Sequence, residues 1–120
     1  MNINEFPWHD AILSNIAIDR RSPGINDTVK FEIQWPGIPR PSTLIFQDVY
    51  WVEMKLNFGI VAEETILTAI EMNEDDIDLQ KFYSTWKGQF DTVKLKVFKF
   101  ILNSTASEIK IMAKALKEIA

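Results

Sequence analysis

The sequence contains no cysteine, and this absence excludes several kinds of chemistry at once. A chain without thiols forms no disulfide, offers no cysteine nucleophile and holds no metal through thiolates. Histidine is almost as scarce, because His9 is the only one. The four glycines are dispersed, so the chain has no glycine-rich loop of the kind that binds phosphate. We expect no metal site and no cofactor.

Long apolar runs are also missing. No stretch approaches the roughly 20 consecutive apolar residues that span a bilayer, and the first residues lack the basic segment and apolar run of a signal peptide. We therefore expect a cytoplasmic protein that makes no membrane contact. A length of 120 residues and a hydrophobic content of 47% fit one domain, residues 1–120, with a packed core.

Catalytic groups are few. His9-Asp10 is the only pair from which general acid–base catalysis could start, and no serine stands in a G-x-S-x-G pattern. The acidic stretch 75–78 lacks the glycine and the spacing of a calcium-binding loop. We expect His9 to be a turn residue before a strand, and we expect the protein not to be an enzyme.

Charge is distributed unevenly along the chain. Residues 1–80 carry 14 acidic and 5 basic side chains, a formal charge of −9, whereas residues 81–120 carry 3 acidic and 8 basic side chains, a formal charge of +5. The acid is densest at 71–78, where five of eight residues are carboxylates. Such a block either marks a solvated helix start or faces a basic partner. An acidic protein is a poor ligand for phosphate backbones, so we expect no direct binding to nucleic acid.

Alternating polar and apolar residues predict strands at 28–35, 52–58 and 93–97, and 12–18 also has strand character. Segment 44–46 begins the 52–58 strand or an adjoining one. The alternation changes phase at 98–102, which indicates a bulge or a strand buried on both faces. The predicted core of the two central strands consists of Phe31, Ile33, Trp35, Met54, Leu56 and Phe58.

One segment has clear helical spacing. Its apolar residues follow the pattern i, i+3, i+4, i+7, with Asn73 or Asp75 as the expected N-cap and Gly88 as the expected stop; they are Leu79, Phe82, Tyr83 and Trp86. Segments 63–72 and 108–119 fit either a helix or a strand. The whole pattern predicts the α+β class, with an antiparallel sheet of about five to six strands packed with one or two helices.

Three stretches resemble a known group of proteins. They are Trp8-His9-Asp10-Ala11-Ile12-Leu13, Leu56-Asn57-Phe58-Gly59, and the stretch 100–111, which reads F-I-L-N-S-T-A-S-E-I-K-I. Together they resemble small bacterial proteins counted among polymorphic-toxin immunity proteins, including those encoded beside contact-dependent growth-inhibition toxins. The resemblance favours a strand at 108–119. Ala106 stands where that pattern has glycine.

The resemblance implies a non-enzymatic immunity protein that binds and neutralises a cognate toxin domain, such as a basic nuclease, through an acidic surface. The carboxylates expected to contact the toxin are Glu63, Glu64, Glu71, Glu74, Asp75, Asp76 and Asp78. The alternative is a small interaction domain that works as a homo-oligomer, such as a homodimer with exposed aromatic residues between its subunits. A hydrolase that uses His9 is a distant third.

Overall fold

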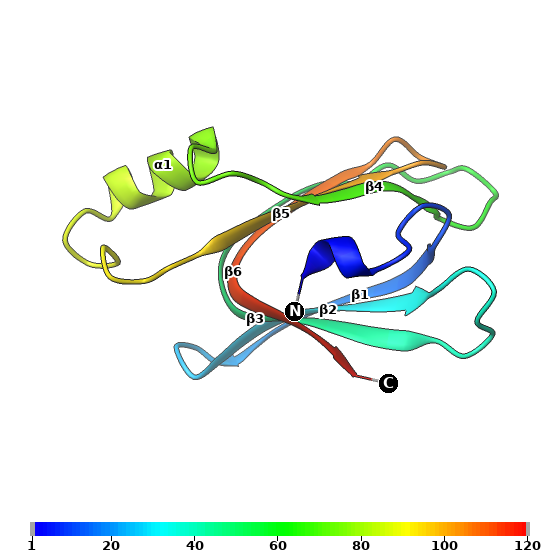
Figure 1. Ribbon diagram of the computed structural model, residues 1–120, viewed down its shortest axis with the longest axis horizontal. Helices are drawn as coiled ribbons and strands as arrows, with labels where there is room; N and C mark the ends of the chain where they lie inside the picture. Colours follow the sequence, from blue (N-terminus) through cyan, green and yellow to red (C-terminus); the bar gives the residue numbers. More distant parts are fainter. Residues whose placement is uncertain (1, 120) are drawn as a thin grey trace.

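The computed structural model describes residues 2–119 and consists of one antiparallel sheet with a single α-helix. Six strands lie in the spatial order β1-β2-β3-β6-β5-β4 (Figure 1). The elements are η1 (Ile3–Glu5), β1 (Ile12–Ser22), β2 (Asn26–Gln34), β3 (Ser42–Lys55), β4 (Ile66–Glu71), α1 (Ile77–Thr85), β5 (Lys96–Leu102) and β6 (Glu108–Ile119). The predicted α+β class and antiparallel sheet are confirmed, and both ambiguous segments contain strands, β4 and β6.

The sheet curls until its two edge strands meet at one end. Ile12 of β1 forms an isolated bridge with Thr65, just before β4. The Leu13 N–H donates to the Glu64 carbonyl at 2.8 Å, and the Ile66 N–H donates to the Ala11 carbonyl at 2.8 Å. These bonds pair backbone groups that would otherwise remain exposed at the edges of an open sheet.

The N-terminal segment fills the space inside the curl. In Figure 1 the short helix η1 lies between β4 and β5 on one side and β1 and β2 on the other. Ile3 is fully buried there, and the Trp8 indole N–H donates to its carbonyl at 2.6 Å. Four phenylalanines complete this inner core with edge-to-face or tilted ring contacts; they are Phe31, Phe46, Phe98 and Phe100.

Helix α1 covers part of the opposite face of the sheet. Leu79 and Phe82 of the helix join Val97 of β5 and Met112 of β6 in a second apolar cluster. Val97 and its neighbour Phe98 are both buried, one on each face. The pairing of β5 with β6 continues without a shift, so the phase change in the sequence reflects a strand buried on both faces and not a bulge.

Several sequence predictions were wrong in detail. Strand β3 ends at Lys55, and the expected core residues Leu56 and Phe58 lie in the following loop with 38% and 85% of their surfaces exposed. The predicted strand at 93–97 begins only at Lys96. The N-cap of α1 is Asp76 and neither Asn73 nor Asp75, because the Asp76 carboxylate receives the first free N–H groups of the helix.

Candidate functional site

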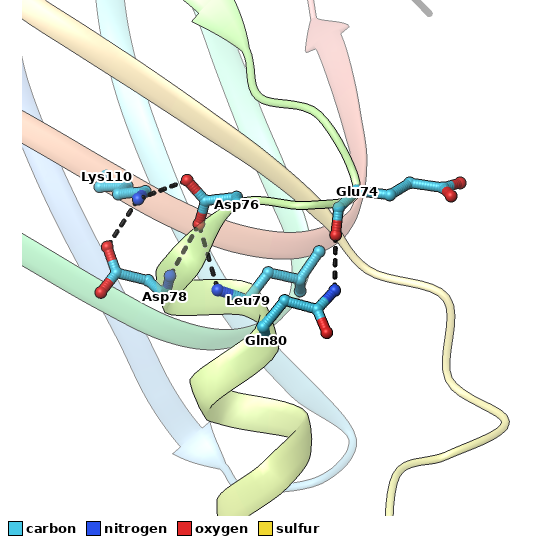
Figure 2. Close-up of polar contacts among 6 residues, drawn as sticks. All are labelled: Glu74, Asp76, Asp78, Leu79, Gln80 and Lys110. Atoms are coloured by element: carbon cyan, nitrogen blue, oxygen red, sulfur yellow. Dashed lines mark hydrogen bonds and ion pairs between the residues drawn. The ribbon is translucent and has the colours of Figure 1, made fainter.

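The acidic segment, residues 71–78, contains an ion-pair cluster at the start of α1 (Figure 2). The Asp76 carboxylate accepts hydrogen bonds from the backbone N–H groups of Asp78 and Leu79, both at 3.1 Å. Its other oxygen lies 2.8 Å from Nζ of Lys110, and the same ammonium lies 2.6 Å from Asp78. Two of the carboxylates expected to bind a toxin therefore attach α1 to β6.

Burial and hydrogen bonding act in opposite directions on this cluster. The Asp76 side chain is 3% exposed and the Lys110 side chain is 12% exposed. Burial disfavours the charged form of Asp76, but the hydrogen bonds from Lys110 and the Leu79 N–H prevail and lower the pKa of its carboxyl. Burial likewise opposes the charge on Lys110, and its bonds to Asp76 and Asp78 raise its pKa. Both groups are held in their charged forms.

The other carboxylates of the acidic segment remain at the surface. Glu71, Glu74 and Asp75 are exposed and form no ion pair among residues 2–119. Figure 2 shows the Glu74 side chain extending away from Lys110, while the Glu74 backbone carbonyl accepts a 2.7 Å bond from Gln80. The segment thus divides into two structural and three free carboxylates.

Glu63 and Glu64 lie elsewhere. They precede β4, whereas the acidic segment begins at its last residue, and a six-residue strand extends roughly 20 Å. Glu64 accepts hydrogen bonds from the Ser104 N–H and the Thr105 hydroxyl, and the Ser104 hydroxyl donates to the Glu63 carbonyl at 2.6 Å. The structure therefore does not bring all seven predicted residues into one patch.

The segment between β3 and β4 forms a second exposed feature, which we call the apolar loop, residues 56–62. Phe58 exposes 85% of its surface, Ile60 58% and Val61 103%. Sequence reasoning placed Phe58 in the core and did not single out Ile60 or Val61. Their sequence signal is weak, because Phe58 and Ile60 continue the alternation of the preceding strand.

Both ends of the apolar loop are attached to the turn between β5 and β6. The Asn57 N–H donates to the Ser107 hydroxyl at 2.9 Å, and its side-chain amide donates to the Thr105 carbonyl at 3.1 Å. At the other end Glu63 and Glu64 bind the same turn. The three stretches that carry the family resemblance therefore meet at this end of the molecule, because 8–13 also borders it through the Leu13–Glu64 bond.

His9 stands apart from both features. Its side chain is 70% exposed and lies 3.6 Å from Asp10, and its Nδ1 lies 3.4 Å from the Leu67 carbonyl. Among the described residues no group of three or more His, Cys, Asp or Glu side chains is arranged to hold a metal ion. The noncatalytic role expected of His9 stays a prediction.

A hollow of about 540 Å³ lies between the β1–β2 hairpin and the connection from α1 to β5. Tyr50 and Phe90 form part of its wall. Three charged residues line it: Arg20 and Asp27 bind each other at 2.9 Å, and Asp48 forms no ion pair among residues 2–119. Within residues 2–119, the acidic segment and the apolar loop are two surfaces that offer unused binding groups.

A comparison of the chain with known protein families finds no match, and a search of curated proteins finds no relative. Across residues 2–119, no helix has the length and apolar character needed to cross a membrane.

Proposed function

We propose that this chain is a non-enzymatic immunity protein that acts in the bacterial cytoplasm by binding and neutralising a cognate toxin domain. The observation that carries the proposal is the division of the acidic segment into structural and free carboxylates. Asp76 and Asp78 fix the segment to Lys110, and this leaves Glu71, Glu74 and Asp75 exposed on a held framework.

Fixed surface carboxylates suit the recognition of a basic protein. Their field accelerates the encounter with a positively charged partner and lowers the rate of association with acidic ones. A toxin that cleaves nucleic acid presents a positive surface to phosphates, and an acidic inhibitor can occupy that surface. Because the segment is held by the ion-pair cluster, its ordering upon binding costs little conformational entropy.

The test is charge reversal at the free carboxylates alone. The protein is co-expressed with the product of the immediately upstream gene, the complex is purified, and association is followed by stopped flow at low and high salt. Glu74→Lys with Asp75→Lys should slow association about tenfold or more at low salt and weaken its salt dependence. The melting temperature should change little, since neither side chain touches Lys110.

Glu32→Lys is the control, because Glu32 is exposed on β2 and its reversal changes the charge in the same sense. It should slow association far less than Glu74→Lys alone. Equal effects of the two single variants would mean that net charge acts without a defined acidic contact. Failure of the upstream product to bind the wild-type chain would contradict the proposal that this chain neutralises a toxin encoded beside it.

A further inference from the structure

The apolar loop exposes hydrophobic side chains that the fold does not require at the surface. Phe58 and Val61 are almost fully exposed, yet the loop is not a loose connection, because Asn57 and Glu63 attach its ends to the turn 103–107. Most proteins bury such residues or use them as contacts. Because both ends are attached, binding costs this loop less conformational freedom than a segment without attached ends would lose, so the loop is suited to an interface.

A hollow of about 440 Å³ lies against the loop, which forms part of its wall with Leu56, Phe58 and Ile60. The rest of its lining combines apolar residues, such as Leu13 and Leu102, with polar groups of the turn between β5 and β6. A projecting group next to a hollow of similar character is what a two-fold interface needs, because each subunit then supplies the projection that fills the other's hollow.

The charges at the two ends of the loop have the same self-complementary character. Lys55 precedes the loop and Glu63 follows it; both are exposed, and neither forms an ion pair among residues 2–119. When two such loops lie antiparallel across a two-fold axis, Lys55 of each copy lies against Glu63 of the partner subunit. The acidic segment lies at the far end of β4 and stays free.

We propose that the apolar loop is covered by a second copy of this chain, in an isologous dimer in which Phe58 of each subunit enters the hollow of the other. Two short loops and two hollows form an interface at the lower end of the size range of specific complexes. We expect dissociation in the micromolar range, because weak and transient complexes are typical of interfaces this small. The dimer leaves Glu71, Glu74 and Asp75 accessible, so it is compatible with toxin binding and does not depend on it.

Sedimentation velocity of the purified chain, from about 1 µM to 1 mM, tests the dimer without any toxin. The wild type should change from monomer to dimer over this range. Phe58→Ser should remain monomeric throughout, with an unchanged melting temperature. Ile25→Ser is the matched control, because Ile25 is 75% exposed at the tip of the β1–β2 hairpin; this variant should dimerise as the wild type does.

Charge exchange tests the antiparallel arrangement. Lys55→Glu alone and Glu63→Lys alone should each weaken dimerisation about tenfold, and the double variant should recover most of the loss. Thermal melts check each monomer, because Lys55 lies opposite Glu108 of β6 in the strand register and its reversal places two carboxylates there. A wild type that stays monomeric at every concentration overturns the proposal. Loss of binding to the upstream gene product in Phe58→Ser also overturns it, because the loop then belongs to that partner. If the double variant recovers no dimerisation, the two-fold arrangement is wrong.

Discussion

At the scale of single residues, Ala106 is the clearest departure from ordinary backbone geometry near the candidate surface. Its φ of 56° places it in the left-handed region, where a Cβ costs roughly 1–2 kcal/mol. Its neighbours Thr105 and Ser107 hold Asn57 at the start of the apolar loop. The turn therefore has to keep this shape to support the loop, and glycine is the residue that adopts it without strain.

Ala106→Gly should raise the free energy of unfolding by about 0.5–1 kcal/mol. Glycine removes the backbone strain of roughly 1–2 kcal/mol. Its greater freedom in the unfolded chain lowers stability by about 0.4–1 kcal/mol, which is the smaller of the two effects. Urea unfolding followed by tryptophan fluorescence measures the change. Ala17→Gly in β1 is the control and should lower stability by about 0.5–1 kcal/mol, because it adds only backbone freedom. A less stable Ala106→Gly variant would contradict the strain argument.

At the scale of elements, the alternation of polar and apolar residues predicted the strands where one face of the sheet is buried. Alternation located β2 correctly, since Phe31, Ile33 and Trp35 are all buried. The same alternation failed beyond Lys55, because Leu56 and Phe58 are apolar without being part of the strand. A pattern of period two records only which residues are apolar, and the position where pairing with β6 stops depends on distant residues.

The candidate site was less predictable than the fold for the same reason. The acidic segment is visible in the sequence, but its division depends on Lys110, which lies 34 residues beyond Asp76. The attachment of the apolar loop depends on bonds from Asn57 to residues about 50 positions away. Local propensity contains no information about such contacts, because the curled sheet creates them.

Helix α1 supplies a prediction at the same scale, since adjacent aspartates in its acidic segment have opposite roles. Asp76→Ala should lower the free energy of unfolding by about 2–3 kcal/mol. The change removes the N-cap, which is worth about 1 kcal/mol. It also leaves Lys110 with Asp78 as its one remaining partner. The cost of this loss is below the roughly 3–5 kcal/mol of an entirely unpaired buried charge, because one ion pair is kept. Chemical denaturation measures the loss.

Asp75→Ala provides the matched comparison, because Asp75 is exposed and bonds nothing among the described residues. It should change stability by less than about 0.5 kcal/mol. Equal losses in the two variants would mean that the acidic segment acts through its total charge and not through the cap and the ion pair.

At the scale of the whole molecule, the charge imbalance of the sequence is partly resolved by the fold. The acidic first two-thirds and the basic last third meet where Asp76 and Asp78 bind Lys110 of β6. Two exposed pairs in the β1–β2 hairpin, Arg21 with Asp19 and Arg20 with Asp27, act more locally. The fold thus neutralises charge at its helix–sheet junction and leaves an acidic excess on the surface.

This arrangement predicts how stability depends on pH. The pKa of Asp76 in the folded chain lies below its ordinary value of 3.8, because hydrogen bonds outweigh burial. At a pH between the folded and the ordinary pKa, the unfolded chain therefore binds more protons than the folded one. Stability is therefore full above about pH 5 and falls as the pH drops through the folded pKa. Lys110 has a raised pKa, so its contribution is full below 10.5 and is lost only as the pH rises through the folded value. Stability should be flat between about pH 5 and pH 9.

Urea midpoints measured from pH 2.5 to pH 9 check this profile. Asp76→Asn should be less stable on the plateau and should lose stability less steeply below pH 4, because its side chain no longer binds a proton. The acid slope that remains belongs to groups such as Asp19, whose pKa is lowered by its hydrogen bond with Arg21, and Asp27, whose pKa is lowered by the Gly24 N–H. Parallel profiles for the variant and the wild type would show that Asp76 does not control the acid limb, and the ion-pair cluster would then not be the junction through which charge stabilises this fold.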